Sequence, residues 1–253
     1  MVSLSIAIST FGDRIRFLES YNFDSRVEYL ILWQKPTDFT FVLPSNVKLF
    51  RLDSVGVTKS RNMAIELFET EWLWFMDDDV SIPKNTIGTV LLAINKTKAD
   101  RVIISSVFDE YKTPIKKYDK SHSNVLTDII NVGTIQIIIN KNVVKDATIR
   151  FPISMGAGSN YPACDEPVFL SRLFKAKIIS GFEFDNNIVV HHPRISSGLF
   201  LNKKGCLISR AILFKEMFGF PICIGASIYF FAKNISRVKF KFIYLFFFWH
   251  NGG

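Results

Sequence analysis

The sequence predicts an α/β protein in which helices cover both faces of a mostly parallel sheet. Short apolar runs typical of strands alternate with helical segments between residues 4 and 106, and this alternation is the pattern of a parallel sheet. A length of 253 residues is enough to bury a sizeable core, either in one large domain or in a domain with an appendage.

The expected elements follow one another closely in the first half of the chain. We expect strands over residues 4–9, 28–33 and 47–52, a helix over about 58–69, a strand that starts at Trp72, a helix over about 84–96 and a strand over 101–106. Residues 107–134 are polar and are predicted to form a loop that covers a site. A strand over 134–140, a glycine-containing mobile loop over 154–164, a helix over 168–175 and short strands near 178 and at 188–190 are expected to complete the fold.

Three consecutive carboxylates, Asp77, Asp78 and Asp79, directly follow the apolar run that starts at Trp72. The run predicts a buried strand, and ligands of parallel sheets bind at the carboxyl ends of the strands. Adjacent carboxylates repel one another and lose hydration on burial, whereas a hard divalent cation takes oxygen ligands. A solvated acidic turn is the alternative. The buried strand favours a cation site.

Further polar residues are expected at the same edge of the sheet. Thr10 and Gln34 fall at the ends of the first two predicted strands. Arg61 lies in the first turn of the helix over 58–69, where the helix dipole favours an anion such as a phosphate. A solvated surface position suits Arg61 equally well. Because the chain contains neither a P-loop nor a Gly-x-Gly-x-x-Gly motif, any nucleotide is expected to be held without a glycine cradle.

Two pairs of residues in the second half extend the list of candidates. Asp165 and Glu166 precede the predicted helix over 168–175, a position that carboxylates also favour simply because they stabilise helix N-termini. His191 and His192 follow the last predicted strand. A histidine there is either a metal ligand or a packed imidazole.

In their order along the chain, these segments resemble the glycosyltransferases of family 2, which have the GT-A fold. The resemblance spans nearly the whole chain and is most specific in the combination of motifs, since an Asp-x-Asp alone is a weak signal. The C-terminal part is similar to bacterial members that build surface polysaccharides. The residues that carry the resemblance are Thr10, Phe11 and Arg14, Gly56 with Ser60-Arg61-Asn62, Phe75 to Val80, Tyr161 to Glu166, and His191-His192-Pro193 with Ser196-Ser197-Gly198, Gly205, Arg210 and Phe218-Gly219.

The resemblance implies an inverting transfer of a sugar from a nucleotide-sugar donor, most often UDP-linked, with Mn²⁺ or Mg²⁺ as cofactor. It implies Asp79 as the first metal ligand, Asp77 directed to the ribose and diphosphate as well as the metal, and His191 as either a third metal ligand or a contact to the diphosphate. A carboxylate that takes the proton of the acceptor hydroxyl is then Glu166, with Asp165 as the second choice. The donor-binding residues implied are Thr10, Phe11, Arg14, Gln34, Arg61, Asp77 and Asp78.

Two features depart from the family pattern. In many relatives the second strand ends in an aspartate that reads uracil, whereas here it ends in Gln34, so Gln34 is expected to take over this hydrogen-bonding role. The acidic pair is usually Glu-Asp or Glu-Glu, whereas here Asp165-Glu166 is followed by Pro167. The choice between the two carboxylates as base therefore stays open.

The last 53 residues differ sharply from the rest of the chain. They carry eight Lys and Arg residues against one acidic residue, and ten of the 25 Phe. Residues 217–232 form an uncharged run that is short for a membrane-spanning helix, and residues 239–249 are rich in Phe. A basic, aromatic helical tail suits an anionic membrane surface; a spanning hairpin, core packing or a homodimer contact are the alternatives. The polar spacing of a nucleic-acid groove is missing, so no nucleic acid is expected.

We therefore expect a catalytic domain over residues 1–200 and a membrane-associating segment over 201–253. Three widely spaced cysteines and the lack of a signal peptide indicate a reducing compartment, and the predicted location is the cytoplasmic face of the inner membrane. The predicted acceptor is a lipid-linked glycan of the capsule or O-antigen type. The alternatives are a haloacid-dehalogenase-like phosphatase that uses Asp77 and Asp79, and a non-catalytic sugar-nucleotide binder.

Overall fold

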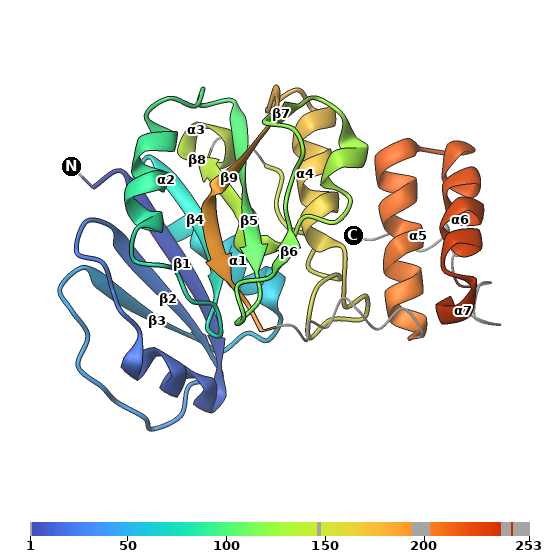
Figure 1. The fold of residues 1–253 in the computed structure, drawn as a ribbon. Helices are drawn as coiled ribbons and strands as arrows, with labels where there is room; N and C mark the ends of the chain where they lie inside the picture. Colours follow the sequence, from blue (N-terminus) through green and yellow to red (C-terminus); the bar gives the residue numbers. More distant parts are fainter. Residues whose placement is uncertain (1, 146–147, 194–202, 239–243, 245–253) are drawn as a thin grey trace.

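A single nine-stranded sheet runs through the protein, with helices on both faces (Figure 1). The computed structural model describes residues 2–145, 148–193, 203–238 and 244. The strands are β1 Leu4–Phe11, β2 Glu28–Gln34, β3 Val47–Leu52, β4 Trp72–Asp77, β5 Arg101–Phe108, β6 Pro114–Lys116, β7 His122–Ser123, β8 Ile137–Asn140 and β9 Gly181–His191.

The helices connect these strands and extend the chain at its C-terminal end. The α-helices are α1 Val57–Leu67, α2 Thr86–Ile94, α3 Lys141–Val144, α4 Asp165–Lys175, α5 Lys204–Phe218, α6 Ile222–Lys233 and α7 Ile235–Val238. Three 3₁₀ helices, η1 Gly12–Ser20, η2 Leu126–Ile129 and η3 Thr134–Gln136, complete the described elements.

The strand order places the ends of the central strands at one edge of the sheet. The order is β3-β2-β1-β4-β8-β5-β9-β7, with β6 paired to β5. Strands β1 to β4 are parallel to one another, β8 is antiparallel to both β4 and β5, and β9 is parallel to β5. The predicted mostly parallel sheet is confirmed, and β1, β2, β4 and β5 all end at the same edge.

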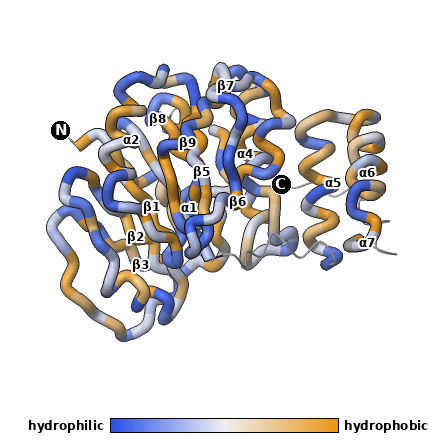
Figure 2. Tube along the Cα trace, in the orientation of Figure 1, coloured by the Kyte–Doolittle hydropathy of each residue, from blue (hydrophilic) through white to orange (hydrophobic). Residues whose placement is uncertain are grey.

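Strand β4 is apolar from Trp72 to Met76 because both of its faces are covered. Leu73 and Phe75 belong to the core shared with α1, α4 and α5. Trp72, Trp74 and Met76 belong to the core on the opposite face, beneath η1 and α2. Figure 2 shows these apolar stretches running through the central strands. Burial on both faces is the physical reason for an uninterrupted apolar strand.

Two predicted strands differ from the structure. No strand forms near residue 178, because Lys177 takes a left-handed conformation (φ 57°) and Ile178 N–H donates to the Leu173 carbonyl at 3.1 Å, closing the end of α4. The strand predicted over 134–140 begins only at Ile137, since the Gln136 side chain accepts from Gly133 N–H at 3.0 Å and closes η3.

The region predicted as a loop over residues 107–134 contains short regular elements. Strand β6 pairs with β5, strand β7 pairs with β9, and η2 follows them. Helix α4 also begins at Asp165, three residues earlier than predicted. Both acidic residues of the predicted pair therefore lie in its first turn.

Helix α5 packs against α4 and shares a core with the sheet (Figure 1). Its buried residues include Ile212, Leu213 and Met217, which belong to the same apolar cluster as Leu73 and Phe75. Among the described residues, no helix is both long and apolar enough to cross a membrane. The predicted boundary at residue 200 and most of the Phe-rich stretch over 239–249 fall outside the described residues.

Candidate active site

Several predicted site residues meet where β1, β2 and β4 end. The register pairs Ser9 with Asp77 and Phe11 with Gln34, so the end of β1 lies between the acidic segment and the end of β2. Thr10 is buried between these two pairs. Parallel pairing thus brings together three segments that are separated in sequence, as predicted for the carboxyl edge of such a sheet.

A buried guanidinium, that of Arg61 on α1, joins this edge to the acidic pair on α4. Its Nη1 contacts Asp165 Oδ2 in a short ion pair and Glu166 Oε1 at 3.4 Å, while Nη2 lies 3.8 Å from Asp77 Oδ1. Burial favours the neutral form of Arg61, but these three carboxylates outweigh it and raise the pKa. The structure therefore surrounds Arg61 with carboxylates of the protein itself. Its predicted contact with the donor stays a prediction.

The pKa values of Asp165 and Glu166, the two carboxylates of α4 beside Arg61, are shifted in opposite directions. Burial and the negative charge of Glu166 raise the pKa of Asp165 to about 7, against the pull of Arg61. Burial also acts to raise the pKa of Glu166, but Arg61 and a 2.5 Å hydrogen bond from Thr134 Oγ1 outweigh it, so this pKa is lowered. The pair takes up its first proton on Asp165. Glu166 stays ionised at neutral pH.

The loop before α4 approaches Asp165 so closely that a glycine is required. Gly156 has φ 87°, and a Cβ at this position would stand 3.0 Å from Asp165 Cγ and 2.9 Å from Thr58 Cγ2. The loop is tied to α1 by a hydrogen bond from Val57 N–H to the Ala157 carbonyl at 3.2 Å. A side chain at Gly156 would therefore displace the carboxylate that pairs with Arg61.

Asp78 is buried and supports Arg14. It accepts from Thr10 Oγ1 at 2.7 Å and from Arg14 Nε at 3.0 and 3.1 Å. Arg14 also reaches Asp79 Oδ2 at 3.0 Å, and its side chain is 47% exposed. The predicted role of Asp78 in donor binding stays a prediction. Asp78 positions Arg14, which faces solvent at the rim of the site.

Asp77 and Asp79 retain the properties of cation ligands. Each side chain is one-third exposed. Burial raises the pKa of Asp77, Arg61 opposes this, and Asp79 and Glu166 raise it further. A divalent cation would relieve this repulsion. No group of three His, Cys, Asp or Glu side chains suited to a metal exists among the described residues, and the predicted cation site stays a prediction.

The histidine that approaches the acidic segment is His192. Its Nε2 lies 3.8 Å from Asp79 Oδ1. His191 instead exchanges both backbone hydrogen bonds with Ser81, at 2.9 and 3.0 Å, and this bridge brings the end of β9 against the residues after Asp79. The prediction that His191 is a metal ligand stays a prediction.

Phe11 and Gln34 form a platform at the outer side of the site. The Phe11 side chain is exposed although β1 is otherwise buried. Gln34 donates from Nε2 to the Gly56 carbonyl at 2.8 Å. Within the described part of the chain, Gln34 Oε1 has no hydrogen-bond donor. An aromatic face next to a free acceptor is the arrangement expected for a base that stacks and donates an N–H.

Sequence reasoning missed Thr134, which holds Glu166 through both Oγ1 and its backbone N–H at 3.3 Å. No local signal marks Thr134, since it lies 32 residues from its partner.

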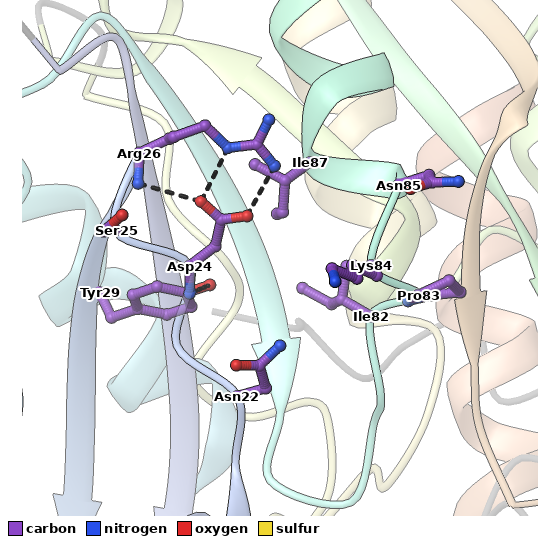
Figure 3. Close-up of a pocket in the computed structure, with 10 residues that line it drawn as sticks. All are labelled: Asn22, Asp24, Ser25, Arg26, Tyr29, Ile82, Pro83, Lys84, Asn85 and Ile87. Atoms are coloured by element: carbon purple, nitrogen blue, oxygen red, sulfur yellow. Dashed lines mark hydrogen bonds and ion pairs between the residues drawn. The ribbon is translucent and has the colours of Figure 1, made fainter.

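A separate hollow of about 490 Å³, between the 22–29 segment and the start of α2, includes none of the predicted site residues (Figure 3).

The family model for glycosyl transferase family 2 matches residues 33–159. The chain belongs to glycosyltransferase family 2. This match covers half of the chain and includes Arg61 and the three consecutive carboxylates. The resemblance described above is thus confirmed. No curated protein sequence matches the chain.

Solved structures of S. aureus TarS share the fold of this family 2 protein. The complex of TarS 1–349 with UDP has a TM-score of 0.63, 16% identity and coverage of 92% of this chain and 72% of that chain. The complex with UDP-GlcNAc has a TM-score of 0.61, 14% identity and coverage of 93% and 78%. The chain spans 65% of another TarS 1–349 structure and 39% of the longer TarS chain. These similarities show the GT-A fold.

The raised pKa of Asp165 predicts how the stability of this family 2 enzyme changes with pH. Between the ordinary value of 3.8 and about 7, the folded state binds more protons than the unfolded state, so stability decreases as pH rises through this window. Asp165→Asn should remove this contribution. Urea unfolding at pH 5 and pH 7 should show that the wild type loses more free energy of unfolding than Asp165→Asn. The exposed Asp38→Asn is the control, and equal losses in all three proteins would contradict the assignment.

Proposed function

We propose that this protein is an inverting glycosyltransferase that moves a sugar from a uridine-linked donor to a hydroxyl of a lipid-linked glycan of the capsule or O-antigen type. The observation that carries the proposal is the position of Glu166. This ionised carboxylate is 16% exposed and is linked through Arg61 to the edge that bears Asp77. A base and a donor-binding edge are thereby joined in one site.

In the proposed reaction the acceptor oxygen attacks the anomeric carbon while the bond from this carbon to the donor diphosphate breaks. Glu166 takes the hydroxyl proton as the new C–O bond forms, and the diphosphate leaves with the bonding electron pair. Arg61 keeps Glu166 ionised, and Thr134 orients its carboxylate. Displacement from the side opposite the leaving group inverts the anomeric configuration.

Asp77 and Asp79 would hold Mn²⁺ or Mg²⁺, and His191 is kept as a proposed third ligand beside the nearer His192. The cation would supply charge stabilisation for the leaving diphosphate. Arg14, which is held by Asp78 and is about half exposed, would contact the nucleotide part of the donor. Cation and guanidinium would act on the same developing negative charge.

The platform of Phe11 and Gln34 supports a uridine-linked donor. The free Oε1 of Gln34 can accept the ring N–H of uracil, a donor that the unprotonated ring nitrogens of cytosine and adenine do not offer. Phe11 offers a face on which the base can stack. The TarS neighbours, which are complexes with UDP and UDP-GlcNAc, are consistent with this choice.

The outer surface of the C-terminal helices supports membrane association at the cytoplasmic face. Large apolar side chains are exposed on and around α6, in a segment with a strongly positive charge balance. Such a surface suits the interface of an anionic bilayer, and a lipid-linked acceptor would be presented there. The exposed residues are Phe220, Ile222, Ile228, Tyr229 and Ile235, each between 54% and 68% exposed.

Two alternative functions receive less support. A haloacid-dehalogenase-like phosphatase needs its nucleophilic aspartate at the end of the first strand, whereas Asp77 ends β4 and is near a guanidinium. A non-catalytic binder of sugar nucleotides would have no use for an ionised carboxylate beside the donor edge. The family match further favours the transferase.

Removing the base should separate donor binding from transfer. Glu166→Gln keeps an acceptor for Thr134 but cannot take a proton, so turnover should fall by about 10²- to 10⁴-fold with UDP affinity retained. Asp79→Asn should weaken the Mn²⁺-dependent binding of UDP. Turnover is followed as UDP release and affinity by calorimetry. Asp100→Asn, at the opposite edge of the sheet, is the matched control. If Asp165→Asn loses turnover and Glu166→Gln retains it, the base is Asp165.

The nucleotide preference should follow the hydrogen-bonding pattern of the base. A thermal-shift panel of UDP, CDP, ADP and GDP with Mn²⁺ should give the largest stabilisation with UDP, since the shift grows with affinity at a fixed ligand concentration. Gln34→Leu should lower the UDP affinity by roughly tenfold, because the N–H of the base then faces an apolar group. A UDP shift equal to that of CDP in the wild type would contradict this reading of Gln34.

The exposed face of α6 should control membrane binding. The triple substitution of Ile222, Ile228 and Tyr229 by Ser should reduce co-sedimentation with phosphatidylglycerol vesicles by at least about tenfold, because it removes three apolar side chains from the interface. Vesicles of phosphatidylcholine should bind the wild type more weakly. Val42→Ser is the control, because Val42 is 95% exposed and lies far from α6 in the sequence. Unchanged sedimentation of the triple variant would exclude this surface as the membrane contact.

A further inference from the structure

The backbone carbonyl of Gly56 fixes the orientation of the Gln34 side-chain amide. Gln34 Nε2 donates to this carbonyl at 2.8 Å. A carbonyl oxygen only accepts hydrogen bonds, so the NH₂ end of the amide faces it and Oε1 faces away. Gln34 is 5% exposed, and among the described residues its Oε1 is not one of the buried polar atoms without a partner. The accessible end of this buried side chain is therefore a hydrogen-bond acceptor.

The position of this carbonyl depends on a backbone conformation that favours glycine. Gly56 has φ 121° and ψ 125° and directly precedes α1. Its carbonyl also accepts from the N–H groups of Lys59 at 3.1 Å and Ser60 at 3.3 Å, in the first turn of the helix. A Cβ on Gly56 would meet no atom within 4 Å. Conformation, and not a lack of space, therefore accounts for the glycine at this position.

The segment over residues 155–158 is attached to the start of α1. Thr58 Oγ1 donates to the Met155 carbonyl at 3.1 Å, and Val57 N–H donates to the Ala157 carbonyl at 3.2 Å. Val57 is the first residue of α1, where backbone N–H groups have no partner within the helix. A carbonyl from a distant part of the chain thus caps this N–H and holds the residue that follows Gly56.

A contact between two glycines extends this attachment to Gly56 itself. Gly158 has φ 83°, and a Cβ built on it would lie 3.6 Å from Gly56 Cα and 4.0 Å from Gly56 N. The 155–158 segment therefore packs directly on the backbone that presents the carbonyl to Gln34. Through Gly156 the same segment approaches Asp165, so it contacts both the nucleotide platform and the acidic pair.

We propose that Gly56 is a positioning residue that sets the base specificity through Gln34, and that the 155–158 segment holds it in place. This proposal rests on the proposed function, because it requires a base at the platform of Phe11 and Gln34. With the carbonyl in place, Gln34 offers an acceptor and favours a ring nitrogen that carries a proton, as in uracil. When the carbonyl is displaced, the amide is free to rotate. Its NH₂ end can then donate to the unprotonated ring nitrogen of cytosine.

The ratio of the UDP affinity to the CDP affinity measures the orientation of this amide. Calorimetry on the full chain with Mn²⁺ gives both affinities for the wild type, Gly56→Ala and Val57→Pro. Alanine at Gly56 is strained at φ 121° and should displace the carbonyl. We expect the ratio to fall by about tenfold in each variant, because UDP loses a hydrogen bond that CDP does not make in the wild type.

Val57→Pro removes the N–H that binds Ala157 without disturbing the helix. Proline is favoured at the first position of a helix, and the ψ of 125° at Gly56 is one that a residue before proline adopts. Val57→Ala keeps the N–H and is its matched control. Gly219→Ala introduces a comparable strain at φ 69°, at the end of α5 and with no atom within 4 Å. Both controls should keep the wild-type ratio.

A background without the amide separates orientation from general damage. In Gln34→Leu, adding Val57→Pro should change the ratio no further, because the group that Gly56 orients is absent. An unchanged ratio in Gly56→Ala or in Val57→Pro, or an equal loss of both affinities, would overturn the proposal. A wild type that binds UDP no better than CDP would also overturn it. Failure of the wild type to bind either nucleotide would instead count against the proposed function.

Discussion

The buried guanidinium of Arg61 is the constraint on which the site depends. It joins α1 to the end of β4 and to the first turn of α4 through three carboxylates. An isolated guanidinium or carboxylate would be very costly at such depth, whereas the group together is stable. The close approach of Gly156 to Asp165 follows from the same arrangement. Arg61 consequently sets both the position and the ionisation of Glu166.

The order of the strands divides the site into two halves. Strands β1, β2 and β4 present the aromatic platform and the exposed carboxylates, which suit a nucleotide and a cation. The antiparallel strand β8 stands between β4 and β5 in the sheet, so β5 and β6 lie beside these strands and not among them. The carboxylates of this site thus come from both β4 and α4, and Arg61 links them.

The predictions that succeeded depend on residues adjacent in sequence or on strand ends. The run from Trp72 to Asp79 identified a buried strand with an acidic end, because burial on both faces requires an apolar strand. Spacing could not assign partners across the chain. Thr134 and Glu166 are 32 residues apart, and Arg61 and Asp165 are 104 apart. The predicted strand near 178 also failed, because the left-handed turn at Lys177 is a property of the helix end that precedes it.

The sequence by itself determined the α/β class, the family and the residues at the carboxyl edge of the sheet, because strand periodicity and motif order are local properties. Only the tertiary structure decided which charges meet. It surrounded Arg61 with carboxylates, used Asp78 to hold Arg14, and brought His192 closer to Asp79 than its neighbour. The physical reason is that Coulombic energy depends on distance and burial in space, and neither can be read from positions along the chain.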